Sequence, residues 1–230
     1  MINKFLKDCK EILGDDYLSK SGEFIYSATN TLRKGDVYLL GFNPGSSPDD
    51  KTQRTIKEDL ENFESTTINK TLDEFWSDDK KSTKPLQDIL PQLIHYLLDI
   101  DLREICQSNL IFARSIDATS LDDFMSHADK CWPCHELILN IIQPKLLLCN
   151  GSGEKNSSYS YIGKKFEVND LEWKEHGNTT ASWKVFNTTI LKRETIVVAF
   201  PHTSYFHKRK DIEGEKWFKE RIEIRMNSLS

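Results

Sequence analysis

Four short apolar runs constrain the fold of this chain most, because each has the composition of a strand that is buried on both faces. The runs cover residues 36–42, 108–112, 145–149 and 195–200, and a polar loop follows each of them. Unbroken apolar strands that alternate with helices are typical of a parallel sheet covered on both sides. The sequence therefore predicts an α/β fold, a three-layer α/β/α sandwich around a four-stranded parallel sheet.

Helices are predicted where apolar residues recur three and four positions apart. Such segments lie around residues 5–13, 56–63, 86–98, 134–142 and 211–226. Pro91 lies inside the third of these, so that helix either starts there or bends there. Residues 152–194 are polar apart from the alternating stretch 183–186, which is typical of an exposed hairpin strand, and we interpret them as an insertion on the same face of the sheet. No linker composition interrupts the chain, so we expect a single domain over residues 1–230.

Charge and cysteine content restrict the class of protein. The chain has 31 Lys and Arg against 36 Asp and Glu, a net charge of −5, so binding to a polyanion requires a local basic patch. Its five cysteines are odd in number and spread along the sequence, which argues against a disulfide framework and favours a reducing compartment. No apolar run of about 18 residues is present, and charges interrupt the first residues. We therefore expect a cytoplasmic protein without membrane contact.

Two polar loops are the strongest indication of a functional site. The first apolar run leads into Gly41-Phe42-Asn43-Pro44-Gly45, and the last leads into Pro201-His202-Thr203-Ser204. Ligands of open parallel sheets bind just beyond the carboxyl ends of the strands. Either loop alone is a common turn or helix-capping sequence. Their joint occurrence predicts an Asn amide and a His imidazole on one crevice.

Four motifs in this order resemble the uracil-DNA glycosylase superfamily, most closely its mismatch-specific and single-strand-selective branches. The motifs are residues 41–45, residues 108–114, a block from Cys131-Trp132-Pro133 to Asn150-Gly151, and residues 202–204. The resemblance covers about residues 35–206, and Thr203 stands where the family usually has proline. It implies a uracil-DNA glycosylase-like fold.

The resemblance also implies a reaction and a set of site residues. Such enzymes act in base excision repair: they flip uracil or another damaged base out of DNA and hydrolyse its N-glycosidic bond. Asn43 would orient the attacking water, and His202 would stabilise negative charge on the departing base. The residues expected to bind the substrate are Gly41, Phe42, Pro44, Gly45, Asn109 and Ser204. Asn109 either reads the base edge or ties down the backbone at a strand.

Residues just after the last motif are candidates for DNA contact. Tyr205 and Phe206 stand where relatives place an intercalating side chain, although adjacent aromatics are also common in cores. Lys208, Arg209 and Lys210 lie in the densest basic run of the chain and either contact backbone phosphates or form a solvated helix start. The expected partner is DNA, single- or double-stranded, bound by a monomer through this local patch.

Two other functions remain open from the sequence. The first is a catalytically weak or inactive module of the same fold that binds a base, a nucleotide or a nucleic acid. The second is thiol chemistry at Cys131 and Cys134, whose C-x-x-C spacing precedes a predicted helix. The six His show no metal-ligand spacing, and the other thiolates of an iron–sulfur cluster are missing, so no metal or other cofactor is expected.

Overall fold

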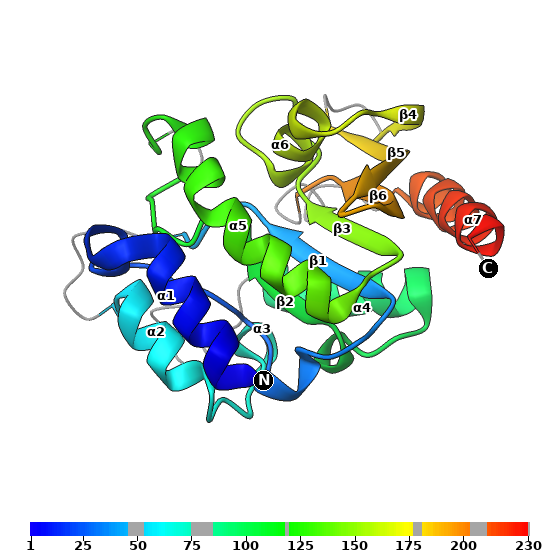
Figure 1. The fold of residues 1–230 in the computed structure, drawn as a ribbon. Helices are drawn as coiled ribbons and strands as arrows, with labels where there is room; N and C mark the ends of the chain where they lie inside the picture. Colours follow the sequence, from blue (N-terminus) through cyan, green and yellow to red (C-terminus); the bar gives the residue numbers. More distant parts are fainter. Residues whose placement is uncertain (46–52, 75–84, 118–119, 177–180, 203–210, 230) are drawn as a thin grey trace.

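One mixed six-stranded sheet organises the part of the chain that the computed structural model describes, residues 1–45, 53–74, 85–117, 120–176, 181–202 and 211–229. The strand order is β2-β1-β3-β6-β5-β4 (Figure 1). The strands are β1 (Val37–Gly41), β2 (Cys106–Asn109), β3 (Leu146–Asn150), β4 (Asn169–Glu175), β5 (Ser182–Ile190) and β6 (Arg193–Phe200). The first four strands in this order run parallel, and β5 and β4 extend the sheet antiparallel.

The register brings the carboxyl ends of the four parallel strands to the same level. Leu40 of β1 is in register with both Ser108 of β2 and Cys149 of β3, and Cys149 is in turn in register with Ala199 of β6. The loops that follow these strands therefore share one edge of the sheet. The strands that follow β1 in sequence lie on its two sides, β2 on one and β3 on the other. The space beyond the carboxyl ends of β1 and β3 is thus the position where open α/β sheets bind ligands.

Helices cover both faces of the sheet. One face packs against α1 (Ile2–Leu18), α2 (Ile56–Phe63), α5 (Phe124–Ile142) and α6 (Ser158–Lys165), and the alternate β1 residues Tyr38 and Leu40 belong to that core. The other face packs against α4 (Pro85–Leu98) and α7 (Ile212–Ser228), together with Val37 and Leu39. Figure 1 shows α1 and α5 on one side of the parallel strands and α4 on the other. The short helices are α3 (Lys70–Asp73), η1 (Thr29–Thr31) and η2 (Leu102–Glu104).

The α/β class, the three layers and the parallel strands agree with the prediction from sequence, and the number of strands does not. The sheet has six strands among the described residues rather than four, because β5 pairs with β6 and β4 pairs with β5. The stretch 183–186 is therefore not an exposed hairpin strand on one face. Trp183, Val185 and Phe186 of β5 are fully buried, since β5 pairs with β6 and both of its faces are covered. The edge strand β4 is largely exposed, with Trp173 59% accessible.

Candidate functional site at the carboxyl edge of the sheet

Gly41 at the end of β1 and Asn109 at the end of β2 lie side by side. The two residues are in register, and a Cβ atom at position 41 would lie 2.0 Å from Asn109 Oδ1. Glycine at position 41 therefore makes room for the Asn109 side chain, which crosses over the strand. Asn109 is half-buried at this edge, so its amide is held close to the β1 backbone and also reaches the surface.

The Asn43 amide is fixed in one orientation by its own loop and by the segment that follows β2. Its Nδ2 donates to Ser115 Oγ at 2.7 Å, to the Pro44 carbonyl at 3.1 Å and to the Ala113 carbonyl at 3.4 Å. Backbone carbonyls only accept hydrogen bonds, so these contacts identify the nitrogen side of the amide. Asn43 Oδ1 accepts no hydrogen bond from the described residues. The amide therefore presents an acceptor oxygen to whatever occupies the edge.

A buried ionic cluster also binds the backbone of this loop. Arg114 Nη1 donates to the Gly45 carbonyl at 2.9 Å, and Arg114 Nη2 donates to Glu23 Oε1 at 2.5 Å. Lys70 Nζ lies 3.9 Å from Glu23 Oε2 and is paired with the buried Asp59. Sequence reasoning missed this cluster, because nothing in the spacing of Glu23 and Arg114 indicates that they meet.

Asn150, at the end of β3, also lies at this edge of the sheet, and the sequence indicated it only as part of a motif. Its side chain is 6% exposed, and no described residue donates a hydrogen bond to its buried Oδ1. The next residue, Gly151, has φ +114° and donates its N–H to the Phe200 carbonyl at 3.0 Å. Ser158 at the start of α6 donates to the Leu40 carbonyl at 3.1 Å. These contacts hold β1, β3 and β6 together at the edge where Asn150 lies.

His202 follows β6 at the same edge. Its side chain is exposed, and desolvation by the surrounding protein still lowers its pKa below the ordinary value. The imidazole is therefore neutral at pH 7 and able to donate one hydrogen bond. Because β3 lies between them, the strands β1 and β6 that lead into Asn43 and His202 are about 10 Å apart. Ser204, Tyr205, Phe206, Lys208, Arg209 and Lys210 lie outside the described residues.

Phe42 and Pro44, two further predicted site residues of the first loop, also pack against the rest of the protein. The Phe42 ring is half-buried, and its centroid lies 5.7 Å from that of Phe124 on α5. Pro44 is buried, whereas Gly45 is exposed and forms a bridge with Ser115. Phe42 therefore anchors the loop on the α5 side, and Asn43 is the residue that the loop presents.

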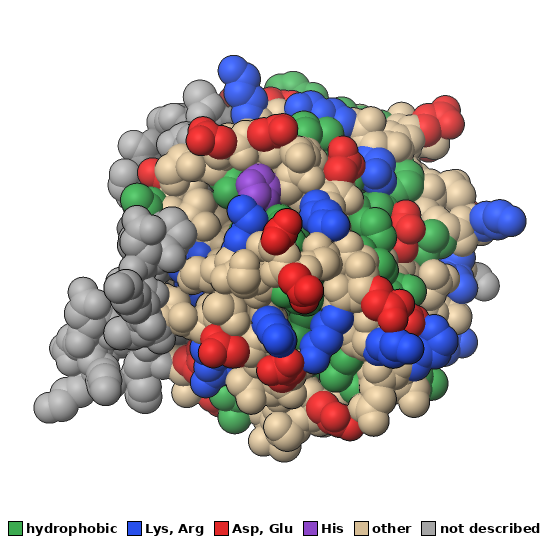
Figure 2. All heavy atoms as spheres, turned by 60° about the vertical axis from the view of Figure 1, so that its left-hand side comes forward, with side chains coloured by type: hydrophobic (Ala, Val, Ile, Leu, Met, Phe, Trp, Pro, Cys, Tyr) green, Lys and Arg blue, Asp and Glu red, His purple; other side chains and the backbone are tan. Residues whose placement is uncertain are grey.

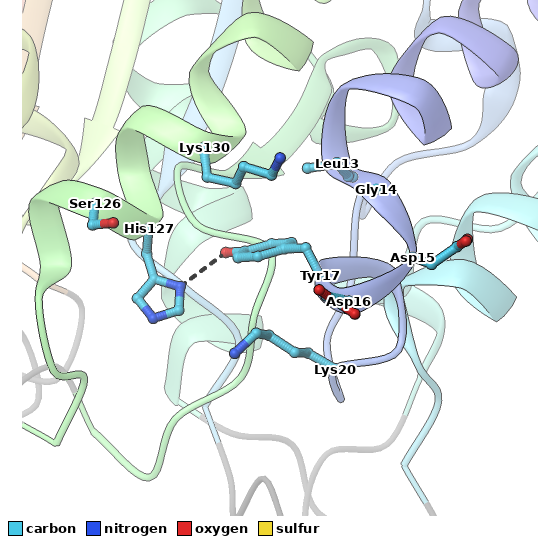
Figure 3. A pocket seen from close by; sticks show the side chains of 9 residues that line it. All are labelled: Leu13, Gly14, Asp15, Asp16, Tyr17, Lys20, Ser126, His127 and Lys130. Carbon is cyan, nitrogen blue, oxygen red and sulfur yellow. Dashed lines mark hydrogen bonds between the residues drawn. The ribbon is translucent and has the colours of Figure 1, made fainter.

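A surface hollow lies between α1 and α5 (Figure 3). It has a volume of about 670 Å³ and is lined by Leu13, Gly14, Asp15, Asp16, Tyr17, Lys20, Ser126, His127 and Lys130. Tyr17 Oη and His127 Nδ1 are 3.2 Å apart across it. No predicted site residue lines it, and Figure 2 shows Lys, Arg, Asp and Glu side chains interspersed on this side of the molecule. The hollow carries charges of both signs.

The two cysteines of the C-x-x-C sequence are packed inside α5. Both are fully buried, and burial raises the pKa of the Cys131 thiol to about 12. Cys131 Sγ donates to Tyr17 Oη at 3.3 Å, which gives the thiol a structural contact. Neither residue has the exposed, low-pKa thiolate that redox or nucleophilic chemistry requires. No group of three His, Cys, Asp or Glu side chains in the described ranges is arranged to hold a metal ion.

The carboxyl edge thus gathers three asparagines and one histidine from four loops or strand ends. Asn109 and Asn43 come from the β2–β1 side, Asn150 from β3, and His202 from β6. None of the helices in the described ranges is long and apolar enough to cross a membrane. In comparisons with known proteins, no family model and no curated protein matches the sequence.

Proposed function

We propose that this protein is a monofunctional DNA glycosylase that hydrolyses the N-glycosidic bond of uracil or another damaged base. The observation that carries the proposal is the fixed amide of Asn43 at the carboxyl edge of the sheet. Its Nδ2 donates to three acceptors of the protein, and its Oδ1 receives no hydrogen bond from the described residues. An acceptor held in this way orients a water molecule whose hydrogen it receives.

The proposed chemistry relies on positioning and electrostatics rather than on a strong base. An amide does not take up a proton at neutral pH, so Asn43 aligns the attacking water with the sugar carbon without activating it fully. The sugar becomes positively charged as the bond breaks, and the departing base becomes negative. The neutral His202 imidazole donates a hydrogen bond to that base, as preorganised donors do at developing negative charge.

Residues at and after the same edge are proposed to contact the substrate. Asn109, held over Gly41, both donates to and accepts from the polar edge of a base. Tyr205 and Phe206 are proposed to fill the space that the flipped base leaves, and Ser204 to bind a phosphate. Lys208, Arg209 and Lys210 are proposed to contact backbone phosphates, since a chain of net charge −5 needs a local basic patch to bind DNA.

The test is a single-turnover excision assay on labelled oligonucleotides that carry uracil, hypoxanthine or a mismatch, in single- and double-stranded form. Alkaline cleavage then reveals abasic sites. We expect the Asn43→Ala variant to lose about 10²–10³ in rate, the usual loss for one preorganised polar group. Asn140→Ala, an exposed asparagine on α5, is the matched control and keeps the wild-type rate. Equal rates for Asn43→Ala and wild type would remove Asn43 from the mechanism.

One observation favours a second function, a module that binds a base or nucleic acid without cleaving it. Glu23 is linked to the loop through Arg114, and it is ion-paired with that arginine rather than presented as a base. Glu23 therefore supplies no general base to the loop, which favours binding over hydrolysis. Binding of the same oligonucleotides without any excision by the wild-type protein would establish this function instead.

A further inference from the structure

The Asn150 side chain is buried without a hydrogen bond to its carbonyl oxygen, which is unusual for an asparagine in a folded protein. Asn69 shows the ordinary situation: it is 2% exposed, its Oδ1 accepts from the Leu72 N–H at 3.3 Å, and its Nδ2 donates to the Leu102 carbonyl at 3.4 Å. An unsatisfied buried acceptor lowers stability. Departures of this kind are concentrated at functional sites, where a ligand supplies the missing partner.

The register places Asn150 beside Gly41, on the side opposite Asn109. Gly41 is in register with Asn109, Leu40 with Cys149, and Asn150 with Phe200. Side chains alternate along a strand, so Asn150 follows Leu148 onto the α4 and α7 face of the sheet, the face to which a side chain at position 41 would also point. Two asparagine side chains therefore flank a residue that has none, on strands about 10 Å apart.

We propose that Asn150 is a second base-contact residue, which together with Asn109 recognises the polar edge of a nucleobase bound at the carboxyl end of β1. This inference rests on the proposed function, since it assigns a further residue to the same site. The edge of uracil presents carbonyl acceptors on both sides of an N–H donor, and an amide is able to pair with either kind of group. No described residue donates to Asn150 Oδ1, whereas three acceptors hold the Asn43 Nδ2, so the Asn150 amide is able to turn either its oxygen or its nitrogen to the base.

Equilibrium binding tests the inference, measured in the Asn43→Ala background so that the base stays in place. The probes are one strand with a single uracil and the same strand with an abasic site analogue. Asn150→Leu keeps the shape of the side chain and removes both hydrogen-bonding groups. We expect it to weaken binding of the uracil strand by about threefold to tenfold, the usual effect of one neutral hydrogen bond, and to leave binding of the abasic strand unchanged.

Thermal unfolding separates a ligand contact from a structural role. Asn150→Leu is expected to melt at or above the wild-type temperature, because it removes an unsatisfied polar atom. Asn69→Leu is the matched control and melts lower, because it leaves the Leu72 N–H and the Leu102 carbonyl without their partner. If Asn150→Leu does not fold, Asn150→Ser replaces it in the binding measurement.

Three results have distinct meanings. Equal loss on both strands, or no loss on either, would overturn the role of Asn150 while the glycosylase function stands. A wild-type protein that prefers the uracil strand but excises nothing would overturn the glycosylase function, and the Asn150→Leu comparison would still support or overturn the base contact. A wild-type protein that does not distinguish the two strands would overturn both.

Discussion

Replacing Arg114 by methionine tests whether the buried ionic cluster supports the Asn43 loop. Arg114 is 7% exposed, and its guanidinium joins Glu23 at 2.5 Å to the Gly45 carbonyl at 2.9 Å. Methionine preserves most of the volume and removes the charge. The Glu23 carboxylate, 17% exposed, then has only Lys70 at 3.9 Å as a cationic neighbour.

The expected cost follows from the burial of the pair. Removing one partner of a buried ion pair destabilises a protein by about 3–5 kcal/mol, because the other charge remains desolvated. Lys70 compensates Glu23 in part, so we expect about 3 kcal/mol, which corresponds to a fall of about 6–12 °C in melting temperature for a chain of this size. The double variant Glu23→Gln/Arg114→Met removes both charges. We expect its loss of unfolding free energy to be smaller than the sum of the two single losses by at least about 1 kcal/mol.

Urea unfolding followed by circular dichroism measures these free energies, and the double-variant cycle isolates the pair. Arg103→Met is the matched control, since Arg103 makes two hydrogen bonds to Asp73 at 2.7 and 2.9 Å while 52% of its side chain is exposed. It should cost less than about 1 kcal/mol, as exposed pairs do. An Arg114→Met variant as stable as Arg103→Met would refute the reasoning.

Two further predictions concern buried titratable groups. Burial lowers the pKa of His135 to about 4, so the folded state binds a proton less readily than the unfolded state; stability is complete above pH 6.5 and falls by about 2 kcal/mol by pH 5. NMR titration should find His135 neutral at pH 5, and a protonated ring there would contradict this. Burial keeps Cys131 and Cys134 as thiols, so iodoacetamide should label neither in the native protein and both in urea; rapid native labelling would reinstate thiol chemistry.

The sequence by itself determined the layers of the fold and the edge of the sheet at which two polar loops lie. Apolar runs such as residues 146–148 and 196–200 are buried on both faces, and short strands of this kind that alternate with helices are typical of a parallel sheet covered on both sides. The polar loop of residues 41–45 and His202 then fall at the carboxyl edge of that sheet, because parallel strands end on the same side.

The extent of the sheet was decided by tertiary contacts. Alternation of Trp183, Lys184 and Val185 indicates a half-exposed strand, and yet Lys184 is 6% exposed. Its ammonium pairs with Glu154 and lies 4.5 Å from the centre of the Tyr159 ring. A lysine that is buried by distant partners has the same sequence signature as one that faces water, so β5 could not be recognised as an interior strand.

The finer structure of the site was also decided only in three dimensions. Residues 41 and 109 are far apart in the chain, and only the register of β1 and β2 shows that glycine at one makes room for asparagine at the other. The Glu23–Arg114 pair and the unsatisfied oxygen of Asn150 depend on contacts between segments with no fixed spacing. Local sequence encodes strands, helices and turns, whereas burial and hydrogen-bond partners depend on the assembled fold.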